Sequence, residues 1–212
     1  MAETDQDLAS RPSSDAAEGA AAPNADGLAK SIQTLGKKRG PAPVHLWNPP
    51  FCGDLDMRIA RDGTWWYLGT PIGRPALVKL FASVLRKDDD KYFLVTPVEK
   101  VGITVDDAPF VAVDFRVADP GGPDQALTFV TNVEDETQAG PEHPIRVARD
   151  PETGEPSPYV HVRANLEALI DRKSFYRLVD ICEHREVEGE SWFGVRSGGE
   201  FFPVIPSAEL PE

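Results

Sequence analysis

The chain has 212 residues, of which 41% are hydrophobic and 27% are charged, and its formal net charge is −13. This composition is typical of a soluble globular protein with a sizeable core, and no apolar stretch approaches the roughly 18 residues that a membrane-spanning helix needs. Residues 1–27 and 119–155 together carry a net charge of −12, so the remaining scaffold is nearly neutral. That leaves room for a local basic pocket, whereas the lack of a Lys/Arg stripe argues against duplex nucleic acid as a partner.

The two cysteines, Cys52 and Cys182, form no disulfide framework, and neither lies at a spacing typical of a metal site. The acidic, polar N-terminus has neither the basic start nor the apolar core of a secretory signal, so we expect a cytoplasmic protein. The four histidines are isolated in the sequence. Common motifs of nucleotide, zinc-protease and serine-hydrolase sites are absent. We therefore expect neither a metal nor a cofactor.

Composition divides the chain into three parts. Residues 1–40 predict a disordered tail, because they hold too little apolar surface to order, followed by a short helix with one apolar face at 28–35. Residues 41–90 predict an N-terminal α+β domain. Residues 91–212 predict a C-terminal domain that is rich in strands and contains one helix.

The N-terminal domain is built on a hairpin and a helix. Asp62-Gly63 supplies the backbone freedom of a tight turn between a strand at 57–60 and a return strand at 65–68. Pro75 suits the first turn of a helix. The apolar face of this helix continues as far as Leu85.

Short strands separated by Pro and Gly clusters dominate the C-terminal domain and predict antiparallel sheets that curl. The acidic, Pro/Gly-rich residues 134–157 predict loops. Asp171 suits the N-cap of a helix, which is the second main helix of the chain. The expected strands lie at 92–96, 102–105, 110–115, 127–132, 159–163, 192–195 and 201–205, with residues 166–170 either strand or turn.

An internal repeat relates the two domains. Residues 71–84 align without a gap to residues 169–182, which places Arg74 over Arg172 at the start of each helix, and the strand after each helix also matches. This indicates a duplicated strand–helix–strand motif in an α+β protein. Two related halves that face one another would form a cleft, and ligands often bind at such interfaces.

Five arginines are the strongest candidates for a binding site, because they lie in predicted strands, in turns or at helix starts. An arginine beside the free N–H groups of a helix N-terminus favours a phosphate, as at Arg74. The alternative is that each pairs with a carboxylate such as Asp54, Asp62 or Glu99. The five are Arg58, Arg61, Arg74, Arg163 and Arg172.

From these we predict that Arg58, Arg74 and Arg163 hold an anion in the cleft. Glu99, at a strand end beside a proline, and Asn132, which offers both a donor and an acceptor, are expected as polar contacts. The guest would be a small phosphate-bearing molecule.

Several motifs together resemble the uncharacterised bacterial domain-of-unknown-function family 1285 across residues 41–205. They include FCGD (51–54), RDGTW (61–65), GTPIGR (69–74), LVKLF (77–81), YFLVTPVEK (92–100) and FVTN (129–132). The resemblance implies an α+β core with duplicated motifs and a C-terminal half superficially like a pleckstrin-homology fold. It also implies an interdomain site for a nucleotide-like ligand and a role in signalling.

Three functions remain open. The first is a non-enzymatic cytoplasmic binding or signalling module with an interdomain cleft for a nucleotide-like or other phosphate-bearing ligand. The second is a protein–protein adaptor or homo-oligomerising module that uses the curled sheet or its edge. The third is an enzyme, which would require a buried carboxylate or thiol with a positioned base.

Overall fold

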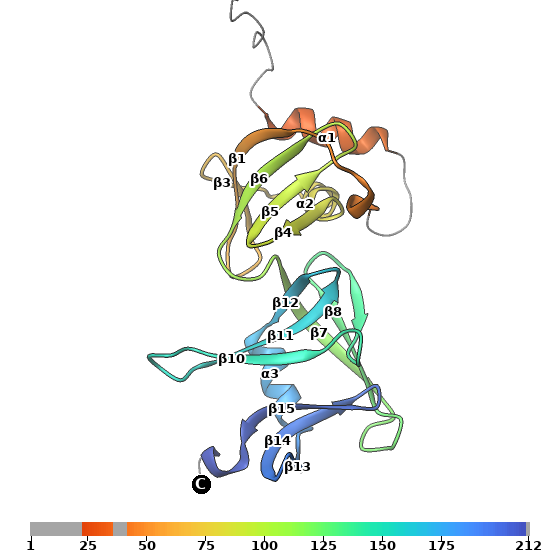
Figure 1. Ribbon diagram of the computed structural model, residues 1–212, viewed down its shortest axis with the longest axis vertical. Coiled ribbons are helices and arrows are strands. Elements are labelled where there is room, and N and C mark those ends of the chain that lie inside the picture. Colours follow the sequence, from red (N-terminus) through yellow and green to blue (C-terminus); the bar gives the residue numbers. More distant parts are fainter. Residues whose placement is uncertain (1–22, 36–41, 211–212) are drawn as a thin grey trace, which may run out of the picture.

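The computed structural model describes residues 23–35 and 42–210, where three α-helices accompany curled, mostly antiparallel sheets (Figure 1). The predicted α+β class is confirmed. The first sheet has the strand order β3-β2-β1-β6-β5-β4, in which β1 and β6 pair in parallel. The first unit comprises α1 (Ala25–Thr34), η1 (Val44–Leu46), β1 (Phe51–Ile59), β2 (Trp65–Tyr67), β3 (Thr70–Pro71), α2 (Pro75–Ala82), β4 (Leu85–Asp88), β5 (Lys91–Val95) and β6 (Lys100–Val105).

The second unit has two sheets. The larger has the order β10-β11-β12-β7-β8-β9, again with one parallel pair, β12 and β7, and the smaller has the order β13-β14-β15. The two sheets and one helix are compatible with a pleckstrin-homology-like second half, which stays a prediction. Its elements are β7 (Phe110–Ala118), β8 (Ala126–Thr131), β9 (Glu136–Gln138), β10 (Ile145–Arg149), β11 (Pro156–Arg163), β12 (Leu166–Ile170), α3 (Arg172–Val179), β13 (Glu183–Val187), β14 (Glu190–Ser197), β15 (Glu200–Pro206) and η2 (Ser207–Glu209).

The two units follow one another along the long axis of the molecule, with the β13–β15 sheet farthest from α1 (Figure 1). We expected the boundary at residues 90 and 91. Instead β5 and β6 hydrogen-bond within the first sheet, so the boundary lies between Val105 and Phe110. The parallel pairing of β6 with β1 is a long-range contact that local sequence patterns do not reveal.

The short helix predicted near the N-terminus is α1, and it docks on the first unit through its apolar face. Leu28 and Ile32 are buried, and the Asn24 side chain caps the helix by accepting from the Gly27 N–H. The disordered tail was expected at residues 1–27; its residues 1–22 lie outside the described residues, whereas residues 25–27 already belong to α1. Burial of the apolar face stabilises a helix too short to be stable alone.

Two local expectations need correction. Helix α2 ends at Ala82, and Leu85–Asp88 forms a strand that pairs with β5 around a turn at Asp89, whose φ is +51°. An apolar run fits either period, and pairing with β5 decides it. Residues 134–157, expected as loops, contain β9 and β10. The sequence did not indicate β10, because its alternating pattern is short and is flanked by Pro and Gly.

The repeat is visible as two helix–hairpin units. Helix α2 is followed by the hairpin β4–β5, and α3 is followed by the hairpin β13–β14. Arg74 is the N-cap residue of α2, and Arg172 is the first residue of α3. The predicted cap of α3 is confirmed, since the Asp171 side chain accepts from the Ser174 N–H.

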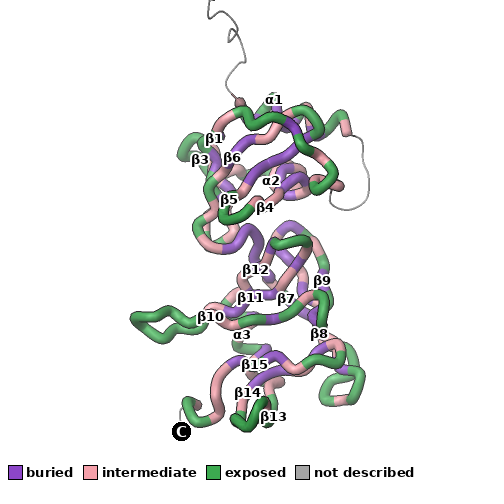
Figure 2. The backbone as a smooth tube through the Cα atoms, viewed as in Figure 1, coloured by how far each residue is buried: buried purple, intermediate pink, exposed green. Residues whose placement is uncertain are grey.

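Buried residues run through the strands and helices of both units (Figure 2), and aromatic side chains are among the largest of them. In the first unit Trp65 and Phe81 stack with ring centroids 6.3 Å apart, and both are almost fully buried. In the second unit Phe110, Phe129 and Leu178 are fully buried. Within the ranges that the structure describes, no helix is long and apolar enough to cross a membrane.

Candidate functional site

Asn132, one of the predicted site residues, lies at the interface between the units. Its Nδ2 donates to the carbonyl oxygen of Gly63 at 3.3 Å, and its Oδ1 accepts from the Val111 N–H at 3.1 Å. Gly63 has a φ of +83°, and a Cβ there would lie 2.6 Å from the Asn132 amide nitrogen. The Asn132 amide therefore joins the hairpin turn of the first unit to β7 of the second.

Arg163 also joins the units. Its Nη2 donates to the carbonyl oxygen of Ala82 at the end of α2, at 2.8 Å, and its Nη1 pairs with the carboxylate of Asp135. The guanidinium lies 4.7 Å from the centroid of the Phe110 ring, and the side chain is only 19% exposed. Protein groups thus surround the charge that we expected to face a ligand.

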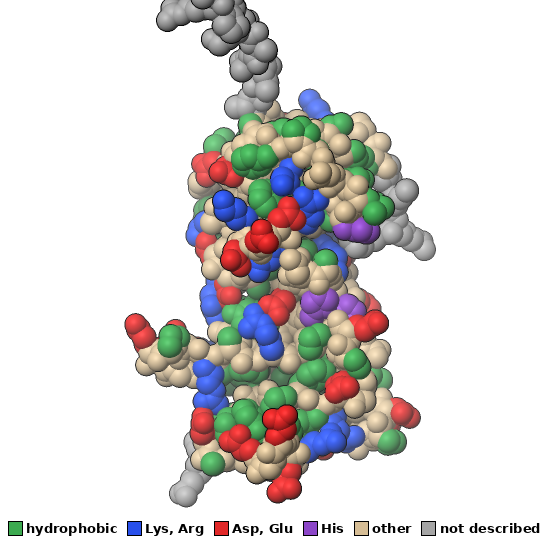
Figure 3. Space-filling view, in the orientation of Figure 1, with side chains coloured by type: hydrophobic (Ala, Val, Ile, Leu, Met, Phe, Trp, Pro, Cys, Tyr) green, Lys and Arg blue, Asp and Glu red, His purple; other side chains and the backbone are tan. Residues whose placement is uncertain are grey.

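The other three predicted residues lie apart from these. Arg58 pairs with Asp106 at 2.7 Å, and Glu99 is half-buried in the turn before β6. Arg74 is exposed, and its side chain makes no ion pair or hydrogen bond with the described residues. Basic and acidic side chains intermingle on the face drawn in Figure 3. Among the described residues, no hydrogen bond or ion pair joins any two of the five predicted side chains.

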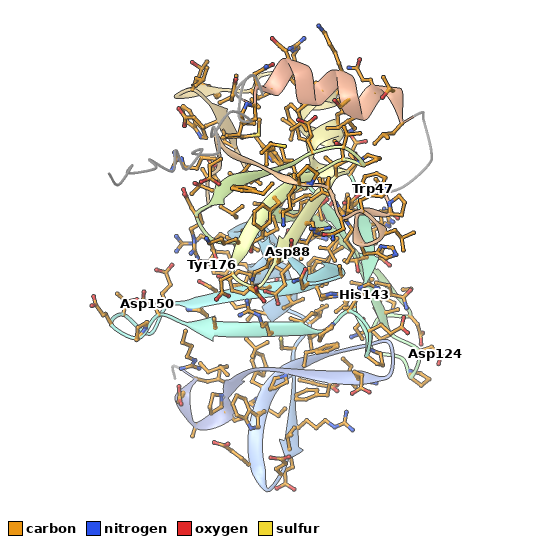
Figure 4. All side chains as sticks on the ribbon, turned by 45° about the horizontal axis from the view of Figure 1, so that its top comes forward. Trp47, Asp88, Asp124, His143, Asp150 and Tyr176 are labelled. Atoms are coloured by element: carbon orange, nitrogen blue, oxygen red, sulfur yellow. The ribbon has the colours of Figure 1, made fainter. Side chains whose placement is uncertain are left out.

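A hollow of about 330 Å³ opens where the turn after β1 meets the second unit, and we call it the junction pocket. One arginine comes from the first unit, and the other residues come from β11, β12, α3 and the loop before β11. Tyr176, labelled in Figure 4, lies on its α3 side. The pocket is lined by Arg61, Glu155, Pro156, Ser157, Pro158, Leu169, Ile170, Asp171, Arg172, Phe175 and Tyr176.

Arg61 is held in place by groups from both units. Its guanidinium pairs with Asp107 at 2.7 Å and donates to the Ser157 hydroxyl at 2.8 Å. Asp107 also accepts from the Tyr159 hydroxyl at 2.7 Å. Burial and this hydrogen bond raise the pKa of Tyr159, so the phenol stays protonated and keeps donating. Arg61 is therefore oriented before any ligand arrives.

Arg172 has a freer guanidinium at the N-terminus of α3. Its Nε donates to the Tyr176 hydroxyl at 3.0 Å, and this hydrogen bond raises the pKa of Arg172. Its Nη atoms have no hydrogen-bond acceptor in the part of the chain that the structure describes. They remain able to bind an anion, and the N-terminus of the helix favours negative charge at the same place.

The junction pocket carries both signs of charge. Glu155 and Asp171 line it with the two arginines, but Asp171 already accepts from the Ser174 N–H at 2.7 Å. Phe175 and Tyr176 add aromatic surface. Over the described ranges, no group of three or more His, Cys, Asp and Glu side chains could hold a metal ion. The arrangement suits a ligand with one anionic group and one flat apolar part.

Two further hollows continue from the junction pocket along the second unit. One of about 180 Å³ shares Pro156 and Phe175 with the junction pocket and is lined mainly by apolar side chains of α3, β14 and β15. The next, of about 520 Å³, lies between β10 and β15. An ion pair between Arg149 and Glu209, at 2.5 Å, lies at its end.

Sequence reasoning found part of the junction pocket and missed the rest. Arg61 and Arg172 were among the five arginines, but they were not in the predicted ligand-binding set. Residues 155–158 were missed because the acidic, Pro/Gly-rich segment 134–157 predicts loops and gives no sign that they approach Arg61. Tyr176 gave one usable signal, because it stands four positions after Arg172, the spacing at which helical side chains meet.

Two family models cover the folded part of the chain. The N-terminal domain of DUF1285, described as a domain of unknown function, matches residues 42–108, and the C-terminal domain, described as a protein of unknown function, matches residues 109–204. The chain belongs to the DUF1285 family. The resemblance drawn from the sequence motifs is confirmed, and the division between the two family domains falls in the segment that separates β6 from β7.

Solved structures of other DUF1285 proteins resemble this DUF1285 protein. A crystal structure of a family protein from Silicibacter pomeroyi DSS-3 has 61% sequence identity and a TM-score of 0.80, covering 89% of this chain and 98% of that one. A second, from Shewanella baltica OS155, has 33% identity and a TM-score of 0.47, covering 59% of this chain and 91% of that one. No curated protein matches the chain.

Proposed function

We propose that this DUF1285 protein is a cytoplasmic, non-enzymatic binding module of the signalling kind, and that it holds a small phosphate-bearing, nucleotide-like ligand in the junction pocket. The observation that carries the proposal is that Arg61 and Arg172 line one hollow of about 330 Å³ built by both units. Its volume lies within the roughly 300–1,000 Å³ of small-molecule sites.

The chemistry of the pocket divides the ligand into two parts. A phosphate would accept from the free Nη atoms of Arg172 and from the pre-oriented Arg61, in charge-assisted hydrogen bonds. A flat ring would lie against Phe175 or Tyr176, since aromatic side chains stack on planar groups. Because the pocket spans both units, a bound ligand would also strengthen the association of the units. This change in association is how the protein would signal that the ligand is bound.

The set predicted from the sequence remains the alternative location within the same proposal. Arg74 is its best-placed member, because it is exposed at the N-terminus of α2 without a protein partner among the described residues. Arg58, Arg163, Glu99 and Asn132 would complete that site. The contacts that Arg163 and Asn132 make across the interface favour the junction pocket over this location.

The repeat supplies a matched pair of variants for the test. Arg172→Ala removes the free guanidinium of the junction pocket, and Arg74→Ala removes its counterpart in the first unit. Thermal-shift screening against nucleotides and phosphorylated metabolites would identify a ligand, because one that binds only the folded state raises the melting temperature. Titration calorimetry would then measure its affinity for each variant.

We expect Arg172→Ala to weaken binding about 10- to 100-fold, the size of a lost charge-assisted hydrogen bond, and Arg74→Ala to leave it unchanged. The reverse result would move the ligand to the set predicted from the sequence. If no phosphate-bearing compound in the panel shifts the melting temperature, the proposed function is wrong.

A protein adaptor is the second candidate, and the outer edge of β10, which borders the hollow between β10 and β15, favours it. Strand β10 ends its sheet, and the backbone groups of Pro144 and Asp150 bond to the β11 side. In an antiparallel pair every second residue bonds to its neighbour, so Ile145, Val147 and Arg149 present their backbone groups outward. Such an edge can pair with a strand of another chain.

Val147→Pro tests the adaptor candidate, because it removes an outward N–H without removing a hydrogen bond between β10 and β11. Light scattering over a range of concentrations would measure self-association of the wild type and the variant. We expect the wild type to self-associate and the variant to be monomeric at the same concentrations. A wild type that is monomeric throughout would exclude homo-oligomerisation through this edge.

A further inference from the structure

Two histidines that are far apart in the sequence meet on the surface of the second unit. His143 precedes β10 and is labelled in Figure 4, and His161 lies in β11. Their Nδ1 atoms are 3.1 Å apart, and their rings stack with centroids 5.1 Å apart and an angle of 28° between the planes. Both side chains are half-buried and so remain open to solvent, and histidine reaches the surface of this unit in Figure 3.

The contacts of His161 fix which of its nitrogens carries a proton. Its Nε2 lies 2.5 Å from the carbonyl oxygen of Ala164. A carbonyl oxygen only accepts, so Nε2 must donate, and Nδ1 of the neutral ring keeps its lone pair. His143 therefore donates its Nδ1–H to His161. One proton lies between two nitrogens that could both act as ligands.

The backbone beneath the pair is held firmly. The His161 N–H donates to the carbonyl oxygen of Pro144 at 3.0 Å, and His143 exchanges two backbone hydrogen bonds with Gly140, each 3.1 Å long. The Thr137 hydroxyl donates to the His161 carbonyl oxygen at 3.2 Å. The two rings are therefore positioned by a network of short contacts and need little ordering to bind a common ligand.

The spacing of the two nitrogens fits a tetrahedral metal ion. Zinc–imidazole bonds of about 2.0–2.1 Å at the tetrahedral angle separate two nitrogens by about 3.3–3.4 Å, close to the present 3.1 Å. Metal-binding histidines almost always donate their other N–H to a carbonyl or carboxylate, and this contact fixes their tautomer. His161 makes such a contact with Ala164 before any metal is present.

We propose that His143 and His161 form a two-imidazole site for a borderline divalent transition-metal ion, with Zn²⁺ as the probe. The metal would take the place of the shared proton, and the Nδ1 proton of His143 would move to its Nε2. Water would fill the remaining positions, because the described residues offer no group of three or more metal-ligating side chains. Imidazole suits Zn²⁺, whereas Mg²⁺ prefers oxygen ligands.

The test uses the metal-stripped full chain in a Cys52→Ser background, because the exposed Cys52 thiol is a competing zinc ligand. His143→Gln and His161→Gln each remove one ligand of the pair. His45→Gln and His184→Gln are the matched controls, since these are the other two histidines of the chain. Titration calorimetry with Zn²⁺, and with Mg²⁺ for comparison, measures affinity and stoichiometry at one fixed pH, because metal affinity depends on pH.

We expect the background protein to bind one Zn²⁺ and no Mg²⁺. Loss of an outer partner of a metal ligand typically costs roughly 10- to 100-fold in affinity, so loss of a ligand itself should cost at least that. His45→Gln and His184→Gln should bind as the background does. No zinc binding by the background protein, or equal binding by all variants, would overturn the proposal.

A spectroscopic measurement on the background protein guards against a variant that fails to fold. Long-range ¹H–¹⁵N spectra of the imidazoles should show His143 protonated at Nδ1 and His161 at Nε2 without metal. With one equivalent of Zn²⁺, the Nδ1 signals of both rings should shift together and both Nε2 atoms should be protonated. Signals from the pair that stay unchanged would refute zinc binding here.

Discussion

The two units share a helix followed by a hairpin, but they differ in what happens next. In the first unit β6 returns beside β1 in parallel, so the hairpin β4–β5 belongs to one continuous six-stranded sheet. In the second, β15 pairs with β14, and β13–β15 forms a sheet separate from β7–β12. The hollows along α3, β10 and β15 lie beside that separation. The separation of the sheets thus leaves hollows that adjoin the junction pocket, which itself lies between the two units.

The two repeated helices also differ in how their N-termini are capped. Helix α2 begins at Pro75 after Arg74, whose side chain makes no capping hydrogen bond. Helix α3 begins after Asp171, whose side chain does. Pro75 has no N–H to satisfy and fixes the backbone by itself. The second helix depends on a polar side chain at the rim of the junction pocket, where a structural role and a binding role coincide.

The largest effect should come from the buried residue that each helix contributes to its unit. Phe81→Ala should lower the free energy of unfolding by about 3–5 kcal/mol, because it leaves a cavity beside Trp65, and Leu178→Ala by about 2–5 kcal/mol. Urea unfolding measures both. Hydrogen exchange in the β13–β15 strands should rise for Leu178→Ala at mild urea concentrations, while the first sheet stays protected. Equal exchange in both units would mean that the two units unfold together rather than separately.

The interface between the units can be weakened at Arg163. Arg163→Ala leaves the Ala82 carbonyl oxygen and the Asp135 carboxylate without this donor, so stability should fall by about 1–3 kcal/mol. Arg58→Ala is the control, because it removes an ion pair whose arginine is 48% exposed and should cost about 0–1 kcal/mol. Urea unfolding curves for the two variants decide the point. If Arg163→Ala is as mild as Arg58→Ala, this contact does not hold the units together.

Capping gives a smaller effect that compares the two helix starts directly. Asp171→Ala should lower the free energy of unfolding by about 0.5–2 kcal/mol, because the Ser174 N–H loses its acceptor. Asp171→Asn should restore most of it, since asparagine is also a good N-cap. Arg74→Ala should have almost no effect. Thermal unfolding measures all three, and a loss for Arg74→Ala as large as for Asp171→Ala would contradict the difference between the helices.

Local signals predicted much of this fold. The hairpin around Asp62-Gly63, the helix start at Pro75 and the cap at Asp171 each follow from a few neighbouring residues, and the structure contains all three. Strand β10 was missed because its five residues lie between Pro/Gly-rich segments. Its existence depends on pairing with β11, which a local pattern does not reveal.

The partners of the arginines were the hardest to predict. Arg163 bonds to Asp135, 28 positions away, and to the Ala82 backbone, 81 positions away. Asn132 bonds to Gly63 across 69 positions. A carbonyl oxygen carries no sequence signal, because every residue has one. Sequence therefore identified which residues carry charge and hydrogen-bonding groups, but the fold decided which of them face protein and which face a ligand.

The two cysteines, one in each unit, should differ in their reactivity towards a thiol reagent. Cys52 in β1 is exposed, whereas burial, aided by the neighbouring charge of Glu183, raises the pKa of Cys182 from an ordinary 9.0 to about 12. The thiolate is the reactive form, and at pH 8 only about one in 10⁴ of the Cys182 thiols would be ionised. A thiol reagent should therefore label Cys52 quickly and Cys182 slowly. Cys52→Ser should abolish the fast phase of labelling.

The same pKa shift predicts how stability changes at high pH. The folded protein keeps the Cys182 thiol protonated, while the unfolded chain releases its proton first, near pH 9. The free energy of unfolding should therefore fall as the pH rises from about 9 towards 12, and this contribution should be fully present below pH 9. Cys182→Ala should flatten that part of the pH profile, and Cys52→Ser should not. Rapid labelling of both thiols at pH 8 would show instead that the segment after α3 opens readily, and the second unit would then be looser than its buried helix face indicates.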